Sequence, residues 1–397
     1  MSQITFTLNP IGDEVFNIKK ISVRTLADVP AVTPFQDSSM GPFRSYNMSL
    51  LTFEDEDGNI GEGPVTAGYI HILQNCIFPQ LLHSGGLRYE ILYPRLYWAI
   101  RNEGFRGPAS SLLGQVDLAL HDLACRRKGV SIQQYLHGVR NHARAYGSGG
   151  GTNYSLAQLE KEMSHFLDLG FSCVKMKVGM HFGKNIREDI ERVRFVRKLI
   201  GKDIRLAVDA NQIWTVMEAM AFMRGVEDQD IAWLEEPVHS AALSEIAQLS
   251  ALSPVGLSFG ESEKSAKVFP ELKKAGVAHL QPAPTHLASV REWMDVRDLA
   301  EKSGLAFSSG GYSHYAAALV STASDGAMVE FLYPLMDGLR EYFAEHPFVE
   351  NGSFVLPDVS GIPIRIDWDR LQRKNKIVGR KTWTVNEVGN YTPMVTS

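Results

Sequence analysis

Residues 171–179 read FSCVKMKVG, a short apolar segment of the kind that forms a buried strand. Alternate side chains of a strand share a face, so Val174 and Met176 point to one side. Lys175 and Lys177 then point together to the other side. Like charge and burial both disfavour two neighbouring ammonium groups, unless that face of the strand is solvated. The presence of both lysines on one face of this strand therefore requires a chemical explanation.

Short apolar segments of this kind recur along the chain from about residue 141. Short apolar segments alternate with helical ones, which is typical of an α/β fold with a parallel sheet. Eight such strands predict a modified TIM barrel of the (β/α)8 kind. The predicted strands are 144–151, 172–179, 204–211, 231–237, 255–262, 277–284, 305–311 and 327–333.

The chain divides into three predicted parts. Residues 1–140 read as an α+β unit, with two strands around a turn at Asp57–Gly58 and then a helical region that stops near Gly129. Residues 141–345 hold the barrel. Residues 346–397 carry turn signals and a β-like run, and we expect them to return to the N-terminal domain.

Length and composition narrow the class of protein. The chain has 397 residues, 44% of them hydrophobic, and a net charge of −5. No basic stripe indicates a nucleic-acid surface, and no run of 18 apolar residues indicates a membrane span. Its three cysteines, Cys76, Cys125 and Cys173, are far apart and form no pairing pattern. With no visible signal peptide, we expect a cytoplasmic enzyme or binding protein.

Acidic side chains collect at the carboxyl ends of three successive predicted strands. Asp209 to Glu235 is a step of 26 residues, and Glu235 to Glu261 is again 26. An equal step of about one strand–helix unit predicts that the three carboxylates lie at one height on the catalytic face of the barrel. Three converging carboxylates repel one another, and a hard cation such as Mg²⁺ would neutralise them; Mn²⁺ is the substitute.

Each acid alone has a simpler interpretation. An Asp or Glu at a strand end is commonly a helix cap or an ion-pair partner. The equal spacing of three acids beside a strand with two lysines favours the metal site.

Four segments, VKMKVG, VDANQ, WLEEP and FGES, resemble the enolase superfamily in its mandelate racemase-like subgroup. The resemblance covers nearly the whole chain. It implies a (β/α)7β barrel covered by an α+β capping domain that the N-terminal region and the C-terminal tail build together. It also implies a Mg²⁺ that holds a substrate carboxylate, a base that removes the proton α to it, and a small carboxylate as the substrate. We also expect a homo-oligomer.

The resemblance assigns roles residue by residue. Lys177 matches the base, and its pKa must then fall well below the free value of about 10.4. Lys175 would help to lower that pKa and contact the substrate. Asp209, Glu235 and Glu261 match the metal ligands. Asn211 would support those ligands, and Glu236 would orient a ligand or cap the next helix.

The far side of the barrel departs from the family pattern. Relatives carry a His–Asp dyad there, but Ala283 stands at the Asp position and Gly310 at the His position. His314 lies four residues later and is the candidate replacement, with a packing role as the alternative. Glu330 matches an acid that bonds the substrate carboxylate, or is an ordinary structural acid.

Dehydration is the main functional hypothesis. With the dyad gone, Lys177 alone would remove the α-proton, and an acid sugar or related 2,3-dihydroxy acid would lose water to give a 2-keto acid. The stretch 33–47, TPFQDSSMGPFRSYN, is typical of a mobile lid, in which Arg44 is a candidate substrate contact or a solvated side chain. The alternatives are a racemase or epimerase, and a catalytically inactive member that binds a carboxylate.

Overall fold

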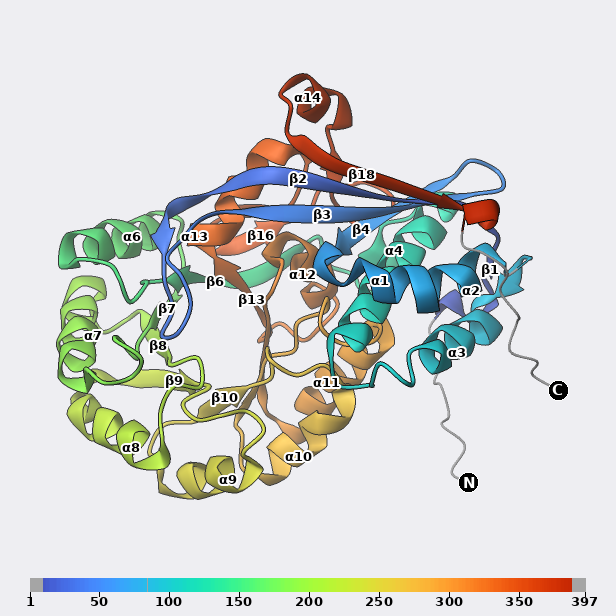
Figure 1. Ribbon diagram of the computed structural model, residues 1–397. Coiled ribbons are helices and arrows are strands. Elements are labelled where there is room, and N and C mark those ends of the chain that lie inside the picture. The colour runs from blue at the N-terminus through green and yellow to red at the C-terminus, as the bar shows by residue number, and fades with distance from the viewer. Residues whose placement is uncertain (1–9, 84, 388–397) are drawn as a thin grey trace.

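The computed structural model describes residues 10–83 and 85–387 (Figure 1). Eight parallel strands form a closed barrel, because each strand pairs with the next and the last, β13, pairs with the first, β6. The predicted modified TIM barrel is confirmed, and all eight predicted strands are present. They are β6 (His142–Gly149), β7 (Cys173–Lys177), β8 (Arg205–Asp209), β9 (Ile231–Glu235), β10 (Leu257–Phe259), β11 (His279–Leu280), β12 (Ala306–Ser309) and β13 (Met328–Leu332).

A helix follows each of the first seven barrel strands and packs outside the ring (Figure 1). Local sequence sets where several of them begin. Ser155 and Thr215 cap two of these helices, each in a reciprocal capping box. The helices are α6 (Leu156–Asp168), α7 (Ile186–Ile200), α8 (Val216–Gly225), α9 (Leu243–Leu252), α10 (Phe269–Lys274), α11 (Val290–Ser303) and α12 (Ser313–Val320).

An antiparallel sheet in the order β18-β2-β3-β4 lies across one side of the barrel, with helices beside it (Figure 1). Its long central hairpin, β2 (Ile18–Phe35) with β3 (Phe43–Asp55), reaches over the barrel beside β7 and β8. The remaining elements of this part are β4 (Ile60–Val65), β18 (Ile377–Thr384), α1 (Ile70–Ile72), α2 (Phe78–Leu82), α3 (Tyr89–Ala99), α4 (Pro108–Lys128), and the short pair β1 (Val15–Phe16) and β5 (Leu87–Arg88).

Helix α4 joins the capping part to the barrel. At Gly114 the helix lies so close to the loop after β11 that an added Cβ would stand 1.7 Å from the Leu287 carbonyl oxygen. The helix ends at Gly129, as predicted, because this residue adopts a left-handed φ of 67°. The close approach fixes the position of the β11 loop, which belongs to the catalytic face.

The tail beyond the barrel extends two sheets that earlier parts of the chain build. β16 (Ser353–Val355) pairs with β6 and extends the barrel sheet, whereas β18 pairs with β2 in the capping sheet. The predicted domain boundaries stay a prediction. The short helix α5 (Ile132–Tyr135) comes before the barrel. The other elements after the barrel strands are α13 (Tyr333–Met336), the 3-10 helix η6 (Asp337–Tyr342), β14 (Phe343–Glu345), β15 (Phe348–Glu350), β17 (Arg365–Ile366) and α14 (Trp368–Arg373).

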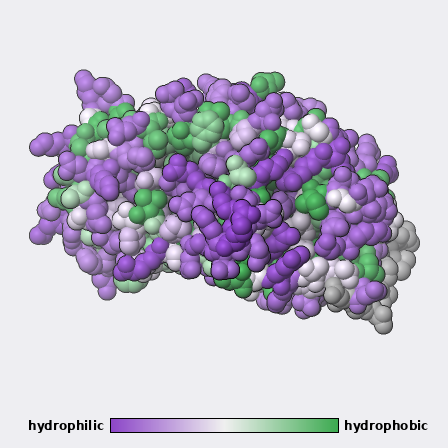
Figure 2. Space-filling view, turned by 90° about the horizontal axis from the view of Figure 1, so that it is seen from above, coloured by the Kyte–Doolittle hydropathy of each residue, from purple (hydrophilic) through white to green (hydrophobic). Residues whose placement is uncertain are grey.

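The surface carries mixed polarity. Hydrophilic residues cover most of the face seen from above, and hydrophobic residues lie among them in small groups (Figure 2). Among the described residues, no helix has the length and apolar character needed to span a membrane.

Candidate active site

The register of three neighbouring strands aligns the base candidate with two of the acids. Lys177 lies opposite Asp209, and Asp209 lies opposite Glu235. Glu261 follows two residues after the end of β10. One carboxylate oxygen from each of the three acids lies within 4.8 Å of the others. The equal spacing in the sequence thus corresponds to one cluster in space.

Both lysines lie inside this cluster. Lys177 Nζ is 2.5 Å from Asp209 Oδ2, and Lys175 Nζ is 2.7 Å from Glu330 Oε1 and 3.4 Å from Asp209 Oδ2. Lys175 also pairs with Glu235. The exposed fraction is 0% for Lys175 and 5% for Lys177, so the alternative of a solvated strand face is wrong.

The predicted lowering of the Lys177 pKa is not found. Burial and the charge of Lys175 lower the pKa of this ammonium, but the carboxylates of Asp209, Glu261 and Glu330 together outweigh them. The pKa of Lys177 is therefore raised above its ordinary value. The pKa of Lys175 is also raised, because Glu235 and Glu330 outweigh its burial. Contacts with acids, rather than the like charge, decide the protonation of both lysines here.

The acids of the cluster carry opposite shifts. Burial raises the pKa of Glu235 well above its usual range, and repulsion from Asp209 raises it further. Burial and the charge of Glu236 raise the pKa of Glu261 to about 8. The pKa of Asp209 is lowered, because Lys177 and Lys175 outweigh its burial. Buried oxygens that repel one another are a donor set that fits a hard divalent cation.

Neighbouring groups fix the three acids in place. Trp233 Nε1 donates to Glu235 Oε2 at 3.1 Å. The Asn211 main-chain N–H donates to Asp209 Oδ1 at 2.9 Å, and its side-chain Nδ2 lies 3.4 Å from Glu261 Oε1. The buried Oδ1 of Asn211 has no hydrogen-bond partner among the described residues. Asn211 thus touches two of the acids, which agrees with its predicted supporting role.

Glu236 does not cap a helix, because α9 begins seven residues later with Ala242 at its N-cap. Its Oε2 accepts hydrogen bonds from Gln212 Nε2 at 2.9 Å and Ser262 Oγ at 3.1 Å. Burial raises its pKa to about 7. Glu236 therefore joins the loops that follow β8 and β10.

Backbone strain gathers around the same acids. Asn211, Gln212 and Glu236 have φ values of 43°, 66° and 36°, in the left-handed region that side chains other than glycine seldom adopt. Such conformations cost about 1–3 kcal/mol each and cluster at functional sites. Their place, directly after the strands that carry Asp209 and Glu235, agrees with a catalytic role for this end of the barrel.

Glu330 fills the space beside the missing dyad. Its Oε1 accepts from Ser148 Oγ at 2.7 Å as well as from Lys175. Burial raises the pKa of Glu330, but the charges of Lys175 and Lys177 and the hydrogen bonds from Lys175 and Ser148 together lower it below its ordinary value. Ala283 and Gly310, at the two dyad positions, provide no titratable side chain. Glu330 is thus part of the charged cluster, bound to a lysine rather than isolated.

His314 does not join the cluster. Its ring in α12 lies among aromatic rings of β13, β14 and β16, with centroid separations of 5.7 Å to Phe343, 5.7 Å to Phe354 and 6.3 Å to Phe331. Its Nδ1 is buried without a hydrogen-bond partner among the described residues. Burial lowers its pKa to about 3, so the ring is neutral. The structure supports the packing alternative and not the predicted acid or base.

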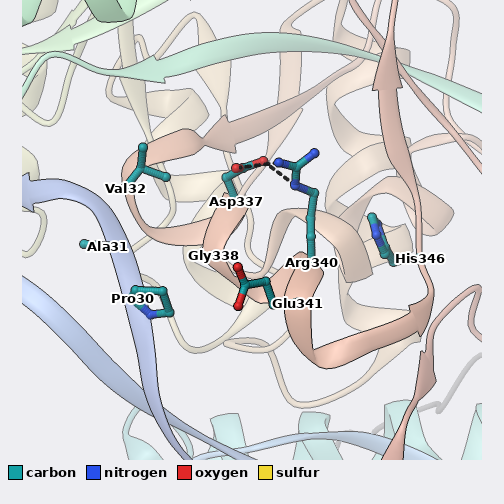
Figure 3. A pocket seen from close by; sticks show the side chains of 8 residues that line it. All are labelled: Pro30, Ala31, Val32, Asp337, Gly338, Arg340, Glu341 and His346. Atoms are coloured by element: carbon teal, nitrogen blue, oxygen red, sulfur yellow. Dashed lines mark hydrogen bonds and ion pairs between the residues drawn. The ribbon is translucent and has the colours of Figure 1, made fainter. Parts of the chain in front are cut away.

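A hollow of about 440 Å³ lies near this aromatic group, between β2 and η6 (Figure 3). Arg340 in its wall is already paired with Asp337, at 2.8 Å from Nε to Oδ1. His346 in the same wall has its ring 5.5 Å from that of His314. The candidate catalytic residues do not line the hollow. Its lining residues are Pro30, Ala31, Val32, Asp337, Gly338, Arg340, Glu341 and His346.

The predicted lid is docked against the barrel at its base. Thr152, in the loop after β6, donates from Oγ1 to the Asp37 carbonyl oxygen at 2.6 Å and from its main-chain N–H to the Gln36 carbonyl oxygen at 2.8 Å. Arg44 is exposed at the start of β3. Its predicted contact with substrate stays a prediction.

Sequence analysis missed His286. This residue lies in the loop after β11, the sixth barrel strand, which stands opposite the second strand, β7, in the closed ring of eight. Its Nδ1 lies 2.6 Å from the Glu261 carbonyl oxygen, and its own carbonyl oxygen accepts from Ser111 of α4 at 3.1 Å. Burial lowers its pKa to about 4. The signal available was its place three residues after Ala283.

Comparison with known proteins identifies the class. Residues 158–370 match the family model described as enolase C-terminal domain-like, and the chain belongs to that family. It is 28% identical over 321 residues to the arabinonate dehydratase of Saccharolobus solfataricus, covering 78% of this chain and 85% of that protein. It is also 28% identical to the 3,6-anhydro-alpha-L-galactonate cycloisomerase of Streptomyces coelicolor, and the match covers 88% of this chain and 98% of that protein.

A solved structure extends the likeness to three dimensions. The crystal structure of a racemase from Streptomyces coelicolor A3(2) with bound magnesium matches with a TM-score of 0.82 and 25% identity, over 90% of this chain and 99% of that one. Dehydratases are lyases, and cycloisomerases and racemases are isomerases. The predicted superfamily, mandelate racemase-like subgroup and enzyme class are thereby confirmed.

Proposed function

We propose that this protein is a Mg²⁺-dependent dehydratase of an acid sugar or a related 2,3-dihydroxy acid, which it converts to a 2-keto acid. The observation that carries the proposal is the place of the base candidate: Lys177 lies 2.5 Å from Asp209 beside the acidic triad. At the two positions of the His–Asp dyad, Ala283 and Gly310 offer no side chain that could act as a base. A relative named arabinonate dehydratase supports the substrate class.

Asp209, Glu235 and Glu261 would hold the metal. When bound, Mg²⁺ would neutralise these acids and stabilise the negative charge that develops on the substrate carboxylate. Lys175, which Glu235 and Glu330 keep protonated, would supply a fixed positive charge beside the same carboxylate.

Lys177 in its neutral form would take the proton from Cα. The electron pair of the C–H bond then forms the double bond between Cα and Cβ, and the C–O bond at Cβ breaks. The leaving hydroxyl receives a proton from the Lys177 ammonium on the same face and departs as water. The enol product takes a solvent proton at C3 and becomes the 2-keto acid.

The test is a screen of aldonic and aldaric acids for 2-keto acid formation with Mg²⁺ in D₂O. We expect one configuration at Cα to react, with deuterium at C3 of the product. Recovered substrate with deuterium at C2 and no 2-keto acid would contradict dehydration. Tight metal-dependent binding with no turnover of any acid would instead favour the inactive carboxylate-binding member.

An epimerase is the second candidate, and the place of His286 favours it. This residue lies in the loop after the sixth barrel strand, which stands opposite the second strand, the one that carries Lys177. With Nδ1 bonded to the Glu261 carbonyl, the other ring nitrogen is left for a substrate. Inversion at Cα that His286→Asn abolishes would establish this alternative.

Two further expectations stay predictions: that the protein forms a homo-oligomer, and that it is cytoplasmic. Light scattering after size exclusion tests the first, and cell fractionation tests the second.

A further inference from the structure

Arg192 of α7 joins the main chain of Lys177 to the loop that follows β6. Its Nη1 donates to the Lys177 carbonyl oxygen at 3.1 Å. Its Nη2 donates to the carbonyl oxygens of Gly150 at 3.0 Å and Gly151 at 2.7 Å. The residue is 3% exposed, so these bonds do not compete with water. One buried cation thus holds three carbonyl groups from two turns.

Asp189 extends the same arrangement to the next residues of the chain. Its Oδ1 is 3.7 Å from Arg192 Nη1, and its Oδ2 accepts from the main-chain N–H of Gly179 at 3.0 Å and of Met180 at 3.2 Å. The pair therefore binds carbonyl and N–H groups of the turn that directly follows the proposed base.

The glycine at the end of β6 and the one that follows it leave no room for a side chain. A Cβ added to Gly149 would stand 2.2 Å from Glu162 Oε2, and one added to Gly150 would stand 2.6 Å from Met176 Cβ. The Gly150 main-chain N–H donates to Glu162 Oε2 at 2.5 Å. The main chain of this loop is thus enclosed by buried side chains on both sides.

The lid rests on the two turns that Arg192 and Asp189 hold. The residue after Gly151 is Thr152, which donates two hydrogen bonds to lid carbonyl groups of residues 36–37. On the other turn, a Cβ added to Gly179 would stand 2.8 Å from the Cβ of lid residue Ser38. A shift of either turn would therefore move both the lid base and the Lys177 main chain.

We propose that Arg192 is a positioning residue that couples the docked lid to Lys177, so that lid contact and base geometry depend on one guanidinium. The proposal rests on the proposed function for the role of Lys177. A displacement of about 1 Å at a reacting group can cost on the order of 10²-fold in rate, which sets the scale of the expected effect.

Arg197 on the same helix is a matched control. It also donates to main-chain carbonyl groups, those of Gly201, Ile204, Gln229 and Asp230. These groups lie at the amino ends of β8 and β9, away from the lid and from Lys177. Loss of Arg197 should therefore reduce stability without reaching the catalytic face.

The experiment compares Arg192→Met with Arg197→Met in the full chain with Mg²⁺. Steady-state kinetics give kcat and KM, tryptic cleavage after Arg44 reports lid docking, and amide exchange reports residues 149–153 and 177–180. We expect Arg192→Met to lower kcat by on the order of 10²-fold, raise KM and speed both cleavage and exchange. Arg197→Met should lower the melting temperature and leave kcat, KM, the rate of tryptic cleavage and the rate of amide exchange unchanged.

The proposal fails if Arg192→Met keeps the wild-type kcat and cleavage rate, or if Arg197→Met changes them equally. Should Arg192→Met not fold, Arg192→Lys replaces it, because a single ammonium cannot reach all three carbonyl groups. A wild-type kcat in that variant overturns the proposal. If the wild type neither dehydrates nor exchanges any α-proton, the proposed function fails, while cleavage and amide exchange still decide the coupling.

Discussion

The Glu330 carboxylate occupies the space into which a side chain at Gly310 would extend. A Cβ added to Gly310 would stand 2.4 Å from Glu330 Oε2, closer than Cβ atoms approach other atoms. Glu330 is held by Lys175 and Ser148, so it cannot move away without breaking an ion pair and a hydrogen bond. The position at which the family resemblance predicts a histidine is thus filled from the neighbouring strand, β13.

Replacing Gly310→Ala should therefore disturb the charged cluster. We expect a loss of about 1–3 kcal/mol in the free energy of unfolding from overpacking, together with a lower kcat, because Glu330 must leave Lys175. Gly326→Ala is the control, since an added Cβ there meets nothing within 4 Å. Thermal unfolding and kinetics on both variants check this, and equal behaviour of the two would contradict it.

Glu235→Gln should abolish activity and weaken Mg²⁺ binding. The amide removes one negative donor from the triad and leaves Lys175 with one carboxylate fewer. Titration calorimetry measures the affinity, with Glu292→Gln as a control at a half-buried acid outside the cluster. Unchanged Mg²⁺ affinity in Glu235→Gln would remove Glu235 from the metal site.

Lys177→Ala should stop exchange of the substrate α-proton while the variant still folds and binds Mg²⁺. General-base loss costs about 10²–10⁴-fold. Proton NMR in D₂O follows the exchange, and Lys161→Ala, an exposed lysine on α6, should match the wild type. Exchange that persists in Lys177→Ala would transfer the role of base to another residue.

Mg²⁺ affinity should rise with pH between about 6 and 9. The raised pKa of Glu261, about 8, means that this ligand binds a proton at neutral pH and must release it to the solvent when the metal binds. Calorimetry in two buffers of different ionisation enthalpy counts the protons released. No release at pH 7 would show that Glu261 is already ionised.

His314→Asn should leave kcat of the folded enzyme unchanged, because the ring packs among aromatic side chains outside the cluster. Its stability should fall by about 1–3 kcal/mol, since a buried polar amide replaces the ring. A large loss of dehydration with normal stability would restore a catalytic role.

The same residue gives a signed pH effect. The folded pKa of His314 is about 3 and the unfolded value about 6.5, so unfolding takes up a proton between these values. The contribution of the neutral ring is present above pH 6.5 and is lost as pH falls toward 3. The free energy of unfolding, measured by chemical denaturation from pH 4 to 7, should rise less steeply with pH for His314→Asn than for the wild type.

Strand periodicity and the 26-residue step were enough to place the acids. Both depend on local patterns, since the carboxyl ends of parallel barrel strands meet at one face whatever the side chains are. The protonation of Lys177 was not predictable in this way. It depends on burial and on which carboxylates surround the ammonium, and the contact with Asp209 comes from the register of two strands.

The surroundings of His314 and His286 could not be predicted from local sequence patterns. The partners of His314 come from β13, β14 and β16, which lie up to 40 residues further along the chain. His286 is a lone histidine in a loop, and only its closure against Glu261 and α4 brings it to the catalytic face. Both outcomes depend on contacts between distant segments, which no single stretch of sequence specifies.

The pairing of β18 with β2 bears on the order in which the molecule can be assembled. Ser22 and Thr382 meet side by side although 360 positions separate them. During synthesis the barrel strands emerge one after another and can pair with the strand made just before. The capping sheet gains its edge strand only after residues 377–384 have left the ribosome. A nascent chain can therefore contain a nearly complete barrel while the capping sheet still lacks β18. Contacts this distant slow folding, and the edge of β2 stays open to wrong partners until residues 377–384 can pair with it.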